Sequence, residues 1–162
     1  MRTFKQIILI ISIIVAVVAL DQFSKAIIRN RLSVGDAIPN HDAFFRIVHT
    51  MNDGVAFSML RGSGNGLIVM QSFLVLVIIA LLVYFCHKNI SILATISLSL
   101  MLGGGIGNLI DRLRFGWVTD FISAGSFPVF NIADSGLTIG CALMLIYVIR
   151  QERKSAKNEK DG

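Results

Sequence analysis

Four long stretches of this 162-residue chain contain no Asp, Glu, Lys or Arg, and this feature limits the possible folds more than any other. The stretches are Gln6–Leu20, Gly62–His87, Asn89–Ile110 and Ser135–Ile149. An apolar helix of about 20 residues is long enough to cross the hydrocarbon core of a bilayer. With 54% hydrophobic residues and a mean hydropathy of +0.73, the chain is too apolar for a soluble domain of its length. We therefore expect an all-α membrane protein with four transmembrane helices.

The first and fourth stretches can cross the membrane only if their helices continue past a charged residue. Each has 15 residues, which as a helix is about 22 Å long. From Lys5 to Asp21, and from Arg150 back to Asp134, the chain takes 16 steps, or about 24 Å of helix. The third stretch brings Asn108 to a similar depth. These polar residues are therefore expected to meet at one face of the membrane.

We expect one membrane-embedded domain over residues 1–162. Its four spans are expected at about 5–25, 66–87, 90–111 and 131–150, with an outer segment at about 26–65 and a solvated tail at about 151–162. The period-two alternation of residues 44–51 predicts a strand, and residues 116–121 and 127–129 are also expected to be extended. The Lys and Arg distribution favours cytoplasmic termini weakly.

Small residues recur at every fourth position in the third and fourth apolar stretches. One series is Ser99, Gly103 and Gly107, and the other is Gly136 and Gly140. Such series let transmembrane helices approach closely. The glycines resemble a dinucleotide-binding loop in their letters, but no strand precedes them. They therefore predict helix contacts.

Several charged residues lie at the ends of the apolar stretches. A charge at mid-bilayer costs roughly 2.5–3.5 kcal/mol on insertion scales, so acids there are candidates for function. Asp21 and Lys25 are spaced i to i+4 and are expected either to form a structural ion pair or to belong to a site. Asn108, Asp111 and Arg112 share one face at the end of the third helix.

A carboxylate pair is expected from Asp120 and Asp134. Asn131 and Asp134 lie one turn apart at the start of the fourth helix, and only thirteen residues separate Asp120 from Asp134. Two carboxyl groups that share a site cannot both ionise readily, so one keeps a proton while the other acts as a base. That arrangement can activate water for peptide hydrolysis without a covalent intermediate.

Composition disfavours other kinds of site. The net charge of +5 comes from scattered basic residues without the pattern of a nucleic-acid interface, so we expect no nucleic-acid partner. His41, His49 and His87 lie far apart, and Cys86 and Cys141 have no CxxC spacing. We expect no metal and no cofactor.

Five blocks of residues together resemble the lipoprotein signal peptidases, or signal peptidase II, along essentially the whole chain. The blocks are Asp21-Gln22-Phe23-Ser24-Lys25, Asn52-Asp53-Gly54-Val55-Ala56-Phe57, Gly107-Asn108-Leu109-Ile110-Asp111-Arg112, Gly116-Trp117-Val118-Thr119-Asp120-Phe121 and Phe130-Asn131-Ile132-Ala133-Asp134-Ser135. The resemblance implies four transmembrane helices, a small extracytoplasmic β-sheet and a short surface helix over the site. It also implies that Asp120 and Asp134 are the catalytic pair of an aspartic endopeptidase.

The resemblance implies roles for the other polar residues too. The substrate backbone would be held by Asn52, Gly54, Asn108, Arg112 and Asn131. Asp21, Lys25 and Ala133 would support the site. Asp111 would orient Arg112 or support the fold.

The implied substrates are prolipoproteins that carry diacylglycerol on a cysteine, cleaved just before that cysteine. The enzyme would lie in the bacterial cytoplasmic membrane among its lipids, with both termini cytoplasmic and the active site near the outer leaflet. Inhibition by the cyclic peptide globomycin and indifference to chelators would follow. The oligomeric state stays open, a monomer included. The charges alone leave two alternatives, a small proton or ion transporter and a non-catalytic membrane scaffold.

Overall fold

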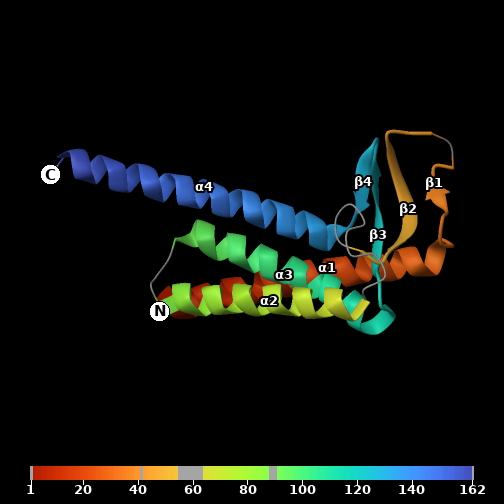
Figure 1. Cartoon of the computed structure of the whole chain (residues 1–162), viewed down its shortest axis with the longest axis horizontal. Coiled ribbons are helices and arrows are strands. Elements are labelled where there is room, and N and C mark those ends of the chain that lie inside the picture. The colour runs from red at the N-terminus through yellow and green to blue at the C-terminus, as the bar shows by residue number, and fades with distance from the viewer. Residues whose placement is uncertain (1, 41, 55–63, 88–90, 162) are drawn as a thin grey trace.

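The computed structural model describes residues 2–40, 42–54, 64–87 and 91–161. Its elements in chain order are α1 (Arg2–Arg31), β1 (Ala37–Ile38), β2 (Phe45–Asn52), α2 (Gly64–His87), α3 (Ile92–Phe115), β3 (Val118–Ala124), β4 (Phe127–Phe130) and α4 (Ile132–Asp161). Figure 1 shows the strands together at one end of the helices, with the start of α1 and the end of α4 at the other end.

α3 is the central helix and packs against α1, α2 and α4. Of its most apolar window, 61% is buried, compared with 11–22% for the other helices. Small residues allow this packing: an added Cβ at Gly103 would lie 2.9 Å from Val17 Cβ, and one at Gly107 would lie 2.7 Å from Asp21 Oδ2. Gly140 of α4 lies against the α3 backbone. The predicted small-residue helix contacts are therefore confirmed.

In the part of the chain that the structure describes, four helices are long and apolar enough to cross a membrane. Large apolar side chains such as Ile11, Phe73 and Leu145 are exposed on their outer faces, where a bilayer would cover them. The expected four-helix membrane fold with a small sheet is confirmed. The short surface helix expected over the site does not occur among the described residues, and residues 55–63 of the outer segment lie outside them.

The first and last helices, α1 and α4, run past their expected ends. α1 continues to Arg31 where an end near residue 25 was expected, and α4 continues to Asp161 where an end near residue 150 was expected. The added segments are rich in Arg, Lys, Gln and Glu, which are good helix formers in water. The last residues are exposed through Asn158, as expected of a solvated tail, but their backbone is helical.

The sheet has four antiparallel strands in the order β1-β2-β3-β4. The β1–β2 part comes from the α1–α2 connection, and β3–β4 comes from the α3–α4 connection. In the β2–β3 ladder Ile47 pairs with Ile122 and Thr50 pairs with Asp120, so β2 has an extra residue between these pairs. Such bulges bend a strand and redirect its side chains. Here the irregularity lies directly beside Asp120.

Candidate active site

A single residue, Asn131, forms hydrogen bonds with both Asp120 and Asp134 at the sheet end of the helices. Asp120 lies in β3 and Asp134 lies in the first turn of α4. Asn131 Oδ1 accepts a hydrogen bond from the Asp134 N–H at 2.9 Å, and Asp134 Oδ2 accepts one from the Asn131 N–H at 3.2 Å. This reciprocal pattern is that of a capping box. The remaining amide group, Asn131 Nδ2, donates to Asp120 Oδ1 at 2.7 Å, so one asparagine links both carboxylates.

The other oxygen of each carboxylate accepts a hydrogen bond from a different asparagine. Asn52 Nδ2 donates to Asp120 Oδ2 at 2.8 Å, and Asn108 Nδ2 donates to Asp134 Oδ1 at 2.8 Å. These neutral donors fix the orientation of both groups without adding a positive charge. Repulsion between two ionised carboxylates therefore favours a state in which the pair keeps one proton.

The pKa of Asp120 is raised to about 6, and burial is the largest cause, since the residue is only 2% exposed. The negative charge of Asp134 contributes to the increase, whereas the hydrogen bonds from Asn52 and Asn131 and the charge of Lys25 oppose it. A carboxyl group with a pKa near 6 can both hold and release a proton close to neutral pH. Acid–base catalysis requires such a group.

A buried ion cluster lies beside the pair. Lys25 Nζ lies 2.8 Å from Asp21 Oδ2 and 3.3 Å from Asp111 Oδ2, and all three side chains are fully buried. Lys25 Nζ also donates to Asn108 Oδ1 at 2.9 Å. Because an ammonium group can only donate, it fixes the Asn108 amide with its NH₂ group toward Asp134.

The two acids of this cluster also hold the backbone next to the aspartate pair. Asp21 Oδ1 accepts a hydrogen bond from the Ala133 N–H at 2.9 Å. Asp111 Oδ2 accepts one from the Thr119 N–H at 3.0 Å. Ala133 and Thr119 each directly precede one of the two aspartates in the chain. The cluster therefore positions both strand β3 and the start of α4.

Arg112 lies at the end of α3 and contacts the outer loop. Its Nη2 donates to the Gly54 carbonyl at 3.0 Å, and the Gly54 N–H donates to Asn52 Oδ1 at 3.0 Å. Its Nη1 donates to Gln71 Oε1 of α2. Asp111 was expected to orient Arg112 or to support the fold. The hydrogen bonds of Asp111 within the described residues run to α1 and β3, which agrees with the second role.

Gln22 and Arg29 also belong to this network, although neither was expected in the site from the sequence. Gln22 Nε2 donates to Asp111 Oδ1 at 3.1 Å, and Arg29 Nη1 donates to Thr119 Oγ1 at 2.9 Å. Gln22, Lys25 and Arg29 are spaced i, i+3 and i+7, so they share one face of α1. That spacing was the available signal. Residue 29 was instead placed in the outer segment because α1 was expected to end near residue 25.

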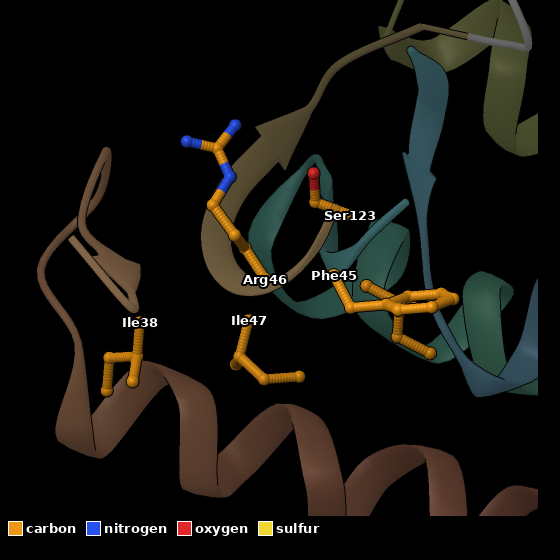
Figure 2. A pocket seen from close by; sticks show the side chains of 6 residues that line it. Ile38, Phe45, Arg46, Ile47 and Ser123 are labelled. Carbon is orange, nitrogen blue, oxygen red and sulfur yellow. The ribbon is translucent and has the colours of Figure 1, made fainter. Parts of the chain in front are cut away.

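A mostly apolar pocket on the sheet is separate from this network. Figure 2 shows Ile38 and Ile47 side by side there, with Arg46 extending away from them. The lining residues are Ile38, Phe45, Arg46, Ile47, Ile122 and Ser123. None of the residues expected in the site lines this pocket, so it is not the candidate active site.

The chemistry of the site follows from its donors and acids. Within the described ranges, no group of three or more His, Cys, Asp or Glu side chains is arranged to hold a metal ion. What the site offers is a pair of carboxyl groups fixed by amides, with a guanidinium group at the neighbouring loop. This set can move protons to and from water and a peptide bond.

Comparisons with known proteins agree with this geometry. Residues 13–150 match the family described as signal peptidase (SPase) II. A lipoprotein signal peptidase of Dehalococcoides mccartyi (strain CBDB1) is 47% identical, with the match covering 80% of this chain and 82% of that protein. One from Halothermothrix orenii is 38% identical over 87% of this chain and 95% of that protein. A solved bacterial membrane enzyme has a TM-score of 0.77 at 36% identity and covers 88% of both chains.

The family match includes all of α3, both hairpins and most of α1 and α4. It therefore includes the aspartate pair and the ion cluster that positions it. The alternative of a proton or ion transporter has no support in these comparisons. The chain belongs to the signal peptidase II family, and it is a bacterial membrane peptidase that cleaves signal peptides.

Proposed function

We propose that this peptidase is an aspartic endopeptidase in which Asp120 and Asp134 activate the attacking water. The observation that carries the proposal is the position of Asn131, which binds both carboxylates. Asn52 and Asn108 hold their remaining oxygens, so both groups are fixed at one place. Fixed acid and base groups at a shared site are what general acid–base hydrolysis needs.

The two aspartates have different roles in the proposed mechanism. Asp120 is almost completely buried and its pKa is about 6, which supports it as the partner that carries the proton. Asp134 is more exposed and takes a proton from the water as it attacks the scissile carbonyl. Asp120 donates to the developing oxyanion, and after proton exchange the leaving amine is protonated.

The proposed substrates are prolipoproteins with a diacylglyceryl group on the cysteine that follows the cleaved bond. The names of the relatives support this substrate class. Arg112, Gly54 and Asn52 lie beside the aspartates, where they can bind the carbonyl and N–H groups of an extended peptide. The outer faces of the helices are apolar, so the acyl chains and the signal helix of the substrate can stay in the bilayer beside them.

The proposed arrangement is a single domain over residues 1–162 in the cytoplasmic membrane. Both termini face the cytoplasm, and the sheet and aspartate pair lie near the outer leaflet. The strands lie at the opposite end of the helices from the start of α1 and the end of α4, which supports placing the termini and the aspartate pair on opposite sides of the membrane (Figure 1).

The test is cleavage of a diacylglyceryl-modified precursor by purified enzyme in detergent. Asp120→Asn and Asp134→Asn should each lower kcat by about a thousandfold or more, because each removes one member of an acid–base unit. Asp42→Asn is the matched control, since Asp42 is fully exposed in the outer segment. Full cleavage by either active-site variant would falsify the aspartic mechanism, and equal cleavage of unmodified precursor would contradict the substrate class.

A further inference from the structure

Gln71 is a buried polar residue within the apolar helix α2. Gln71 is 9% exposed and lies within the candidate membrane span Asn65–Phe85. A side-chain amide in such a place must be hydrogen-bonded, because an unsatisfied polar group in a water-free region is costly. Its partners therefore indicate its role.

Both ends of the Gln71 amide are used. Nε2 donates to the Gly105 carbonyl of α3 at 2.9 Å, and Oε1 accepts from Arg112 Nη1. An added Cβ at Gly105 would lie 3.1 Å from Val75 Cγ2, so α2 and α3 are already in close contact one turn away from Gln71. The Gly105 bond fixes which way the amide faces, and the carbonyl end is thereby directed at Arg112.

Gln71 and Gly54 together determine where the guanidinium group lies. Arg112 binds Gln71 through one terminal nitrogen and the Gly54 carbonyl through the other. The planar guanidinium group is fixed when both nitrogens are bound. It carries more N–H donors than these two bonds use, so it can also donate to a substrate carbonyl.

We propose that Gln71 is a positioning residue for substrate binding: its buried amide holds the Arg112 guanidinium beside Gly54, where Arg112 binds the precursor backbone. This inference rests on the proposed function, in which Arg112 contacts the peptide. Gln71 touches neither aspartate in any hydrogen bond that the described residues make. Its loss therefore affects substrate binding more than the chemical step.

The first experiment measures kcat and KM for a diacylglyceryl lipopeptide with full-length enzyme at fixed detergent concentration. Gln71→Met keeps the length and apolar packing but removes the acceptor. We expect KM to rise about tenfold and kcat to change less than about threefold, as for loss of a hydrogen bond to a charged group that acts in binding.

The second experiment is a double-mutant cycle measured by binding. The Kd of the same lipopeptide is determined in an Asp120→Asn background. Binding can then be measured for every variant, because the measurement does not depend on turnover. If Gln71 acts through Arg112, then Gln71→Met should weaken binding in the Arg112 enzyme but add nothing to Arg112→Lys. Gln71→Asn keeps a polar amide but is one methylene shorter, so it should behave as Gln71→Met does. It replaces Gln71→Met in the cycle if that variant fails to accumulate.

Gln6→Met is the matched control, because Gln6 is also a buried glutamine in a membrane helix but lies in the first turns of α1. It should leave KM unchanged even if it lowers the melting temperature. An unchanged KM in both Gln71→Met and Gln71→Asn, or effects that add to those of Arg112→Lys, would overturn the inference. Cleavage by the Asp120→Asn enzyme would instead overturn the proposed function, so the two failures are distinguishable.

Discussion

Lys25 Nζ donates to Asn108 Oδ1 at 2.9 Å, and this bond decides which end of the Asn108 amide faces the aspartate pair. The same ammonium group lies between two fully buried carboxylates, those of Asp21 and Asp111. Lys25 thus both neutralises the buried acids of α1 and α3 and orients an amide of the candidate active site. Stability and activity should therefore depend on it together.

Lys25→Met tests this dependence. Methionine has a similar length but no charge, so the carboxylates of Asp21 and Asp111 lose their shared cation in a buried site. Removal of one partner from a buried ion pair typically destabilises by about 3–5 kcal/mol. We expect a large fall in the melting temperature of the detergent-solubilised protein together with a loss of cleavage.

The control for this prediction is the ion pair between Arg46 and Asp42, whose atoms lie 3.8 Å apart and whose acid is fully exposed. A pair with a fully exposed carboxylate contributes little, because water already solvates that carboxylate. Asp42→Asn should therefore leave the melting temperature unchanged. A Lys25→Met enzyme that melts at the wild-type temperature would contradict the role given to the buried cluster.

The pKa of Asp120 should move in opposite directions when its two neighbours are changed. Burial raises this pKa from 3.8 to about 6, Asp134 contributes to the increase, and the hydrogen bond from Asn52 opposes it. Asp134→Asn removes a like charge and should lower the pKa of Asp120. Asn52→Ala removes a donor that favours the ionised form and should raise it. Infrared titration of the carboxyl stretch measures both shifts.

The sign for stability follows from the same pKa. Asp120 binds its proton more tightly in the folded protein than in the unfolded chain, so its contribution to stability is fully present below pH 3.8. That contribution is lost as the pH rises through about 6, and it amounts to on the order of 3 kcal/mol.

If Asp134→Asn and Asn52→Ala shifted the pKa of Asp120 in the same direction, the electrostatic description of the pair would be wrong.

Much of the fold could be predicted from the sequence because hydrophobic patterns act locally. The absence of charges marked the four helices, and the alternation of residues 44–51 marked β2. Asn131 and Asp134 also carry a local signal, since their three-residue spacing matches a capping box. Helix ends were less predictable, because charged residues such as those after Arg150 continue a helix as readily as they leave it.

Partners across helices could not be derived in the same way. Gln71 was not singled out from the sequence, and its link to Arg112 depends on how α2 is rotated against α3. The bond between Asn52 and Asp120 depends on the β2–β3 register and its bulge, which no local pattern fixes. The sequence indicated which polar residues needed an explanation, whereas the packing of helices and strands determines their partners.

The proposed orientation predicts a difference in labelling between the two ends of the molecule. Ser126 lies in the exposed β3–β4 turn and Ser155 lies in the exposed last part of α4. In cells whose enzyme carries Cys86→Ala and Cys141→Ala, a membrane-impermeant maleimide should label Ser126→Cys in spheroplasts. It should label Ser155→Cys only after lysis. The reverse pattern would place the aspartate pair at the inner face and contradict the proposed topology.

The glycines of α3 should differ sharply in their tolerance of a methyl group, although they lie within four residues of each other. A Cβ at Gly105 would meet a methyl group of Val75 at 3.1 Å, and a side chain in α2 can move a little. A Cβ at Gly107 would lie 2.7 Å from Asp21 Oδ2, and Asp21 is held by Lys25 and the start of α4. Its movement would disturb the ion cluster.

We therefore expect Gly107→Ala to lower both the melting temperature and kcat, since displacement of Asp21 also displaces the backbone that precedes Asp134. Gly105→Ala is the matched control on the same helix and should cost less than about 1.5 kcal/mol, with near-normal kcat, because only flexible apolar contacts must adjust. Thermal unfolding and cleavage assays on the two variants give the comparison. Equal effects would mean that the space beside Asp21, and hence the rigidity of the cluster, does not limit catalysis.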